Sequence, residues 1–164
     1  MRKADREITD RAALAALLES CDVCRIALPG EDGGAPYIVP MNFGYDYHEN
    51  SGNLTLWFHC ALEGRKLDLI RAAKDTARCG FEMDAEHALW GGDAACDYGM
   101  AYASIIGTGR IAEVTGVGER LHGLTRLMAH YGGAGKPFDE KVLKATCVLR
   151  LEADGFTGKR LKKG

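Results

Sequence analysis

Runs of strand-forming residues separated only by short turns dominate the first third of the chain. They span residues 23–28, 37–45 and 54–59, and the turns at 30–34 and 48–53 are rich in Gly, Asn, Asp and Ser. Turns this short join neighbouring antiparallel strands, because a parallel pair needs a much longer crossover. The chain is therefore expected to begin its sheet as an antiparallel meander.

Three further strand patterns follow, at residues 77–83, 102–114 and 146–156. In the second of them, Gly107 and Gly109 are typical of a bend or of a close approach between backbones. Six mostly antiparallel strands predict a small barrel with helices packed outside, because closing the sheet removes exposed edges. A parallel α/β fold is disfavoured, since strands and helices do not alternate.

Three helices are expected, the first capped by Thr9 or Asp10, the second at residues 63–73 and the third ended by Gly132 and Gly133. The apolar positions expected to face the core are Leu14, Leu17, Leu18 and Cys21 in the first helix and Val117, Leu121, Leu124, Met128 and Tyr131 in the third. Residues 84–99 show little periodicity, so a long functional connection is predicted there.

Length and charge restrict the function. A chain of 164 residues with 46% hydrophobic content suits one domain, with residues 158–164 as a solvated basic tail. The net charge of −2 and the mixed signs argue against a nucleic-acid partner. No secretory signal and no apolar run of about 18 residues is found, so we expect a cytoplasmic protein without a membrane partner.

The six cysteines are expected to be reduced thiols. Cys21 and Cys24 form the only close pair, but they end a helix and enter a strand, whereas a thioredoxin-type motif opens a helix. The histidines His48, His87, His122 and His130 show no ligand spacing, so no metal site is predicted. We interpret the cysteine pair as structural.

A strand that runs through a short turn into a helix carries the main functional signal. Arg65 and Lys66 fall in the first turn of that helix, where the positive end of the helix dipole disfavours cations. An anion would remove the conflict, and Gly64 lets the backbone approach it closely. The segment predicts a phosphate-binding cradle; the alternative is that both side chains simply extend into solvent.

Several fragments, in order and spacing, resemble the FMN-binding split-barrel proteins related to pyridoxamine 5′-phosphate oxidase, and within them the nitroimidazole-resistance (Nim-like) branch. The fragments are residues 37–45, 58–66, 95–100 and 102–107, and the resemblance covers about residues 8–151. It implies a six-stranded antiparallel split barrel that binds FMN. It also implies a homodimer with flavin at the subunit interface.

The resemblance places specific residues around the cofactor. Residues matching Arg65 and Lys66 bind the FMN phosphate, which agrees with the charge argument. Those expected beside the flavin ring and its ribityl chain are Pro40, Met41, Asn42, His59, Cys60 and Ala61. Either Tyr102 or Ser104 is expected to face the cofactor, depending on strand register. Trp90 and Tyr98 are candidates to cover the ring across the dimer interface, with ordinary packing as the alternative.

His59 is the candidate catalytic residue, since an imidazole beside a flavin could donate a proton or orient substrate. The alternative is a structural histidine at the end of a strand. Residues 158–164 lack the proline of the Arg-Leu-x-Pro signature of true pyridoxamine 5′-phosphate oxidases, which argues against vitamin B6 oxidation.

The sequence therefore predicts an FMN-dependent oxidoreductase that acts on a small molecule, a Nim-like nitroreductase being one option, with NAD(P)H as a candidate electron donor. Two other classes stay open. One is a non-catalytic carrier of flavin or haem, and the other is an interaction module without a cofactor.

Overall fold

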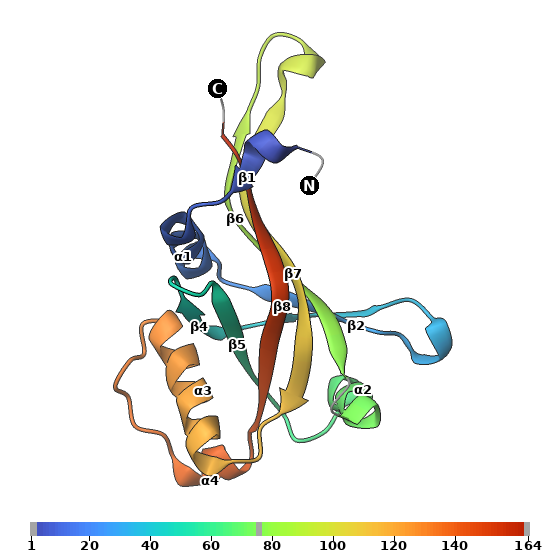
Figure 1. Cartoon of the computed structure of the whole chain (residues 1–164), viewed down its shortest axis with the longest axis vertical. Coiled ribbons are helices and arrows are strands. Elements are labelled where there is room, and N and C mark those ends of the chain that lie inside the picture. Colours follow the sequence, from blue (N-terminus) through green and yellow to red (C-terminus); the bar gives the residue numbers. More distant parts are fainter. Residues whose placement is uncertain (1–2, 75–76, 163–164) are drawn as a thin grey trace.

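A curled antiparallel sheet organises the chain in the computed structural model, which describes residues 3–74 and 77–162 (Figure 1). The strands are β1 (Glu7–Ile8), β2 (Cys24–Leu28), β3 (Tyr37–Met41), β4 (Gly44–His48), β5 (Asn53–Cys60), β6 (Arg78–Trp90), β7 (Gly99–Glu113) and β8 (Cys147–Leu161). Hydrogen bonding follows the order β3-β2-β6-β7-β8-β5-β4, with β1 added beside β8. The predicted mainly β, antiparallel fold is confirmed.

The predicted strand number of six is wrong, because the described sheet has eight strands. The run at residues 37–45 breaks into β3, which pairs with β2, and β4, which pairs with β5. Phe43 lies at the break, with its side chain fully buried and its backbone N–H donating to the Tyr131 hydroxyl over 3.1 Å. The chain changes direction here to bury a large aromatic ring, which a pattern of β propensity does not reveal.

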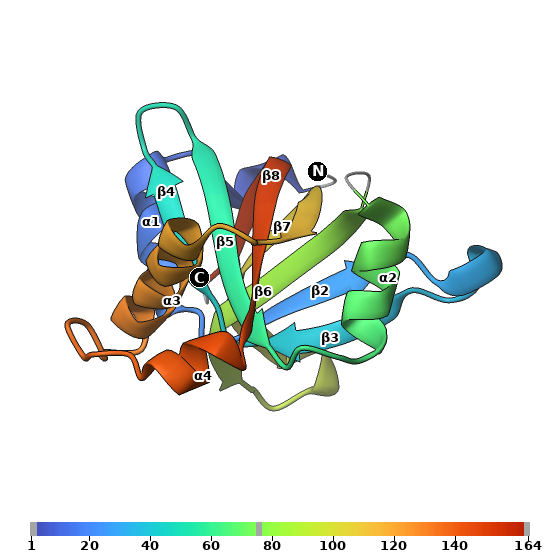
Figure 2. The same cartoon turned by 90° about the horizontal axis from the view of Figure 1, so that it is seen from below.

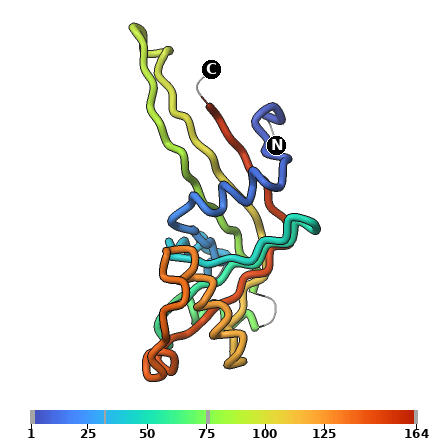
Figure 3. The backbone as a smooth tube through the Cα atoms, turned by 90° about the vertical axis from the view of Figure 1, so that its left-hand side faces the viewer, coloured from blue at the N-terminus to red at the C-terminus, as the bar shows by residue number. Residues whose placement is uncertain are grey.

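Half of the predicted long connection at residues 84–99 is sheet. β6 and β7 stay paired as far as Trp90 and Gly99, and only residues 91–98 form the loop. This β6–β7 arm, defined here as residues 86–101, projects beyond the barrel (Figures 1 and 3). Gly and Ala have low strand propensity, so the sequence did not reveal the paired strands.

The expected basic tail also differs from the structure, since β8 continues to Leu161. Gly158 pairs with Ile8 on one side and Ile105 on the other. A Cβ atom at Gly158 would lie 2.4 Å from Leu14 Cδ2, so the close packing of α1 on β8 requires glycine there.

The helices are α1 (Arg11–Ser20), α2 (Arg65–Ala73), α3 (Val117–His130) and the short α4 (Glu140–Lys144). Asp10 caps α1 by accepting hydrogen bonds from the amides of Ala12 and Ala13. α1 buries Leu17 and Leu18 as predicted. None of the helices in the described ranges is long and apolar enough to span a membrane.

The predicted inner face of α3 is partly wrong. Leu124 is buried as expected, but Val117 is 79% exposed and Leu121 is 44% exposed. The helix instead approaches the sheet through Gly123, where a Cβ atom would lie 2.6 Å from the Trp57 ring. A search for periodic apolar residues does not count glycine, so it missed Gly123 as a contact residue. The buried face of α3 was therefore predicted wrongly.

The core fills the inside of the curled sheet. Its largest fully buried side chains include Phe43, Phe58, Phe81, Leu17, Leu18, Ile26, Met83 and Ile105. α2 lies near β2, β3 and the start of β6, whereas α3 and α4 lie by β4 and β5 (Figure 2). Two opposite sides of the barrel are thus covered by different helices, and α2 belongs to the side where β3 and the end of β5 meet.

Candidate functional site

The predicted cradle forms where β5 ends and α2 begins. Cys60 is the last residue of β5, residues 61–64 form the connection, and Gly64 is the N-cap of α2. Gly64 has φ 127° and ψ 160°, a conformation open essentially to glycine alone. No heavy atom of the described chain would lie within 4 Å of a Cβ there, so the backbone faces open space.

The first amides of α2 are free to bind a ligand. The amides of Leu67 and Asp68 donate to the Gly64 carbonyl over 2.8 and 3.1 Å. The amides of Arg65 and Lys66 donate to no atom of residues 3–74 or 77–162. No side chain caps Gly64 either; Asp68 is the one acidic residue in the first turn of α2, and these two amides have no acceptor in the described part of the chain.

Lys66 turns inward from this helix end. Its Nζ lies 2.9 Å from the Met41 sulfur, which is its one hydrogen-bond partner in the described part of the chain. A thioether is a weak acceptor, and a half-buried ammonium ordinarily has an anionic or carbonyl partner. No carboxylate among the described residues forms an ion pair with Lys66.

Arg65 is placed differently from Lys66. Its guanidinium carbon lies 4.7 Å from the centre of the Tyr37 ring, and Nη2 lies 3.6 Å from a Glu31 carboxylate oxygen. Both charged side chains are more than half exposed, so this ion pair contributes little and can open. Arg65 extends along β3 at the edge of the cradle.

His59 lies on β5 beside the cradle with an exposed side chain. Partial desolvation, and after it the positive charge of Lys66, hold the pKa of His59 below its ordinary value of 6.5. The imidazole is consequently neutral at neutral pH, with one ring nitrogen able to accept a proton. Ala61, two residues further along the chain, is exposed.

Arg71 is a cradle residue that the sequence analysis missed. Its Nη1 donates to the Leu62 carbonyl over 3.2 Å, and its Nε and Nη2 donate to Glu113 over 2.8 and 3.1 Å. Arg71 holds the pKa of the Glu113 carboxyl below its usual range. This bidentate pair fixes the connection before α2 to the end of β7.

The three β3 candidates differ in position. Pro40 is exposed on β3, which in the described sheet is an edge strand beside β2, where a residue without an N–H is tolerated. Met41 is buried and touches Lys66, so it belongs to the cradle. Asn42 is exposed at the break before β4.

Tyr102 and Ser104 share one face of β7, so strand register does not distinguish between them. Residues two apart on a strand project to the same side, and here Ala103 and Ile105 project into the core instead. Lys159 Nζ lies 5.6 Å from the centre of the Tyr102 ring. Tyr102 and Ser104 both lie on the outside of the sheet.

Trp90 and Tyr98 belong to the β6–β7 arm. The Trp90 ring lies over Gly99, and the Tyr98 ring lies over Gly91. Arm and α2 are at opposite ends of the molecule (Figure 1). Within one chain, the structure brings together the candidates on β3, β5 and α2 but leaves those of the arm apart from them.

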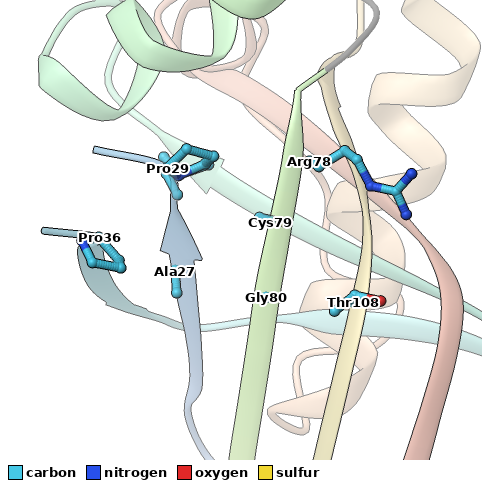
Figure 4. A pocket seen from close by; sticks show the side chains of 8 residues that line it. Ala27, Pro29, Pro36, Arg78, Cys79, Gly80 and Thr108 are labelled. Carbon is cyan, nitrogen blue, oxygen red and sulfur yellow. The ribbon is translucent and has the colours of Figure 1, made fainter. Parts of the chain in front are cut away.

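The protein also has an open groove of about 420 Å³ that none of the cradle candidates lines (Figure 4). Its walls are Ala27, Leu28, Pro29, Pro36, Arg78, Cys79, Gly80 and Thr108. Arg78 is the one charged residue of this wall, and its ion pair with Asp154 engages it. In the described ranges, no group of three or more His, Cys, Asp or Glu side chains could hold a metal ion.

Taken together, the fold and the cradle define a small split-barrel protein in which the first two amides of α2 have no acceptor in the described residues. The chain belongs to the pyridoxamine 5′-phosphate oxidase family, whose model matches residues 10–160. The predicted family is thus confirmed. Comparison with the curated proteins finds no significant match.

Solved structures agree with this assignment. A candidate 5-nitroimidazole antibiotic resistance protein from Bacteroides thetaiotaomicron is 25% identical over 94% of this chain and 86% of its own, with a TM-score of 0.77. An FAD and haem binding protein from Mycobacterium smegmatis is 22% identical over 96% of this chain and 74% of its own, with a TM-score of 0.77. The flavocytochrome Anf3 from Azotobacter vinelandii is 16% identical over 99% of this chain and 72% of its own, with a TM-score of 0.75.

Proposed function

We propose that this protein binds FMN, with the flavin phosphate in the cradle, and acts as a flavin-dependent oxidoreductase on a small molecule. The observation that carries the proposal is Lys66, a half-buried ammonium whose one described hydrogen-bond partner is the Met41 sulfur, 2.9 Å away. A phosphate there would accept from Lys66 and from the two free amides at the start of α2. Membership of the pyridoxamine 5′-phosphate oxidase family supports the same ligand.

The residues present suit such a phosphate in charge and in space. Gly64 leaves the approach to the amides open, and Arg65 can leave its exposed pair with Glu31 to add a second cation. Arg71 is not proposed to bind the phosphate, because its guanidinium already donates to the Glu113 carboxylate. Its proposed role is to hold the connection at Leu62 in place.

A bound flavin would supply the transfer of hydride or electrons, and the protein would supply the orientation and the protons. His59 is proposed as the proton-handling group, since its neutral imidazole can accept a proton at a ring nitrogen and return it to substrate. Pro40 and Asn42 are exposed on either side of Met41, which touches Lys66, and are proposed to line the substrate space.

We also propose that the functional unit is a homodimer. Trp90, Tyr98, Tyr102 and Ser104 lie away from the cradle of their own chain, so they would reach a cofactor only across a subunit interface. Reduction of a nitro group is the proposed specific activity, supported by the 25% identity to the candidate nitroimidazole-resistance protein. The cytoplasm remains the proposed compartment, since six free cysteines suit reducing conditions.

Titration of the purified protein with FMN, followed by flavin fluorescence, tests the cradle. We expect Lys66→Ala to weaken binding about 10- to 100-fold, the loss of a hydrogen bond to a charged group of about 1.5–3 kcal/mol. Arg65→Ala should weaken it less than about 10-fold, since Arg65 is exposed. Lys144→Ala, an exposed cation on α4, is the matched control and should have no effect. An unchanged affinity in Lys66→Ala would refute the phosphate site.

Turnover separates the enzyme from a carrier. We expect the FMN-loaded protein to oxidise NADH or NADPH in the presence of a nitroaromatic compound, and His59→Asn to slow that reaction while binding FMN normally. A protein that binds FMN but consumes neither nucleotide with nitroaromatics, quinones or pyridoxal compounds would be a carrier. A Soret band in place of flavin absorption would indicate haem.

A further inference from the structure

Two cysteines face each other across the sheet next to the cradle. Cys60 ends β5, Cys147 begins β8, and the two are direct partners in the antiparallel ladder. Direct partners project on the same face with Cα atoms about 4.5–5.5 Å apart, which lies inside the range of about 4.4–6.8 Å found for disulfides. Because the pair stands at the end of both strands, a small adjustment can bring the sulfurs together.

The two thiols differ in accessibility. Cys147 is 2% exposed, whereas Cys60 is only half-buried, so a reagent in solution reaches the Cys60 sulfur first. The Cys147 thiol donates to the Val148 carbonyl over 3.9 Å, and it is close enough to the Cys60 sulfur and the Glu113 carboxyl to lower the pKa of both. The pair thus combines an accessible sulfur, a second thiol behind it and a carboxylate that can accept a proton.

The surrounding charges favour a thiolate on the outer cysteine. The hydrogen bond from Cys147 first, and then the charges of Lys66 and Arg71, lower the pKa of Cys60 to about 7, against burial and the charge of Glu113. The same hydrogen bond, with burial, raises the pKa of Cys147. Cys60 is therefore prepared as a nucleophile at neutral pH, and Cys147 keeps its proton until it is needed.

We propose that Cys60 and Cys147 form a redox-active dithiol that low-molecular-weight disulfides oxidise to a cross-strand disulfide. In the first step, the Cys60 thiolate attacks one sulfur of the reagent, whose S–S bond breaks and releases one thiolate. A mixed disulfide on Cys60 remains.

In the second step, Cys147 gives its proton to Glu113, and its sulfur attacks the Cys60 sulfur. The bond to the reagent breaks, and the second thiolate leaves and takes up a proton. Counting the proton that Cys60 released when it became a thiolate, which the first leaving thiolate takes up from solvent, the protein loses two electrons and two protons, and the reagent becomes two thiols. The dithiol lies next to the proposed flavin site, but neither step involves a cofactor, so this chemistry does not require the proposed flavin function.

The other cysteines lack this arrangement. Burial raises the pKa of Cys21 and of Cys79 to about 12, and it also raises the pKa of Cys24. Cys96 is exposed on the β6–β7 arm with no cysteine opposite it in the described ladder. A Cys96→Ser background therefore removes the one fully accessible competing thiol.

Ellman's reagent, an aromatic disulfide whose released thiolate is coloured, tests the proposal on the reduced, folded protein. In the Cys96→Ser background we expect a rapid release of two equivalents per chain and no adduct by intact mass. Adding Cys147→Ala should give one equivalent and a stable adduct on Cys60. Adding Cys60→Ser should abolish the rapid phase. The rapid rate should titrate near the pKa of about 7 that Lys66, Arg71, Glu113 and Cys147 set for Cys60.

Peptide mapping of the unsubstituted protein after treatment with oxidised glutathione provides the second measurement, which needs no variant to fold. We expect a peptide containing Cys60 joined to one containing Cys147. A different linkage, no linkage, or a rapid phase that survives Cys60→Ser would overturn the proposal. Both measurements are made on the FMN-free protein, because an anion bound at Lys66 would raise the pKa of Cys60, and neither expected result requires FMN to bind.

Discussion

At the scale of single residues, Lys66 has the greatest effect on its surroundings. Its ammonium lies against a thioether, and its field reaches both His59 and Cys60, lowering the pKa of each. Any anion that binds Lys66 must weaken that field at both positions. The two side chains can therefore report on occupancy of the cradle without any measurement of activity.

The ring protons of His59, followed by NMR, provide that report. We expect His59 to titrate below 6.5 in the ligand-free protein. Inorganic phosphate or FMN should raise its pKa, because a bound dianion offsets Lys66. Lys66→Ala should raise it as well and remove the response to phosphate. His48, which is exposed in the β4–β5 hairpin, is the internal control, and a response of His48 equal to that of His59 would contradict a local site.

The lowered pKa of His59 also makes the free energy of unfolding depend on pH. A lowered pKa means that the folded chain binds fewer protons at His59 than the unfolded chain does. The contribution of His59 to the free energy of unfolding is thus complete above pH 6.5 and is lost as the pH falls from 6.5 through the folded-state pKa. Urea unfolding of the parent and of His59→Asn should accordingly show a difference in stability that changes across this window and is constant above it.

The sequence predicted those site residues that are neighbours along the chain. Gly64, Arg65 and Lys66 were found because a strand, a turn and a helix start fix their geometry locally. Arg71 with Glu113 and Cys60 with Cys147 were missed, since each pair forms only once strands distant in sequence have settled into register. Periodicity carries no information about that register.

At the scale of elements, the start of α2 depends on the backbone of one residue. Gly64 has φ 127° with open space around it, so an added methyl group would meet no side chain. The cost of Gly64→Ala is then purely conformational, about 1–3 kcal/mol. At about 2–4 °C per kcal/mol for a chain of this size, thermal unfolding should occur several degrees lower.

Gly118 on α3 is the matched control, because a Cβ atom there also meets no heavy atom within 4 Å, but its φ is negative. Gly118→Ala should increase the free energy of unfolding by up to about 1 kcal/mol and so raise the unfolding temperature slightly. If both variants were equally stable, the unusual conformation of Gly64 would not constrain the cradle.

Elements with strong local signals were predicted well, and those that depend on tertiary packing were not. α1, with its Asp10 cap, matches the expectation closely. The division of residues 37–45 between β3 and β4 follows from burying Phe43, and the pairing of β6 with β7 in the arm survives in spite of weak strand formers. In both places tertiary contacts, and not the local strand propensity, determine whether a strand forms.

At the scale of the whole molecule, the β6–β7 arm is the feature that one chain does not explain. It projects from the barrel, and Leu89 on it is 78% exposed (Figure 3). On the outer face of the sheet Ile106 is 58% exposed. Exposed apolar side chains on an arm and on the neighbouring sheet are typical of a surface that a partner covers.

A second copy of the chain is the partner we predict. Sedimentation velocity should give a species of twice 17.8 kDa, and Leu89→Asp with Ile106→Asp should shift it to 17.8 kDa. Val142→Asp on α4, where the side chain is 62% exposed and remote from the arm, should leave the dimer intact. A wild-type chain that sediments as a monomer at micromolar concentration would contradict this assembly.

Dimerisation and FMN binding should then be linked, because the proposed ring-covering residues Trp90 and Tyr98 reach the cradle only from the other chain. The monomeric variant keeps its own Lys66 and free α2 amides, so it should still bind inorganic phosphate and show the phosphate response of His59. Its affinity for FMN, however, should fall with loss of the partner's arm. Equal FMN affinity in monomer and dimer would mean that each cradle is complete within one chain, and the arm would then serve assembly alone.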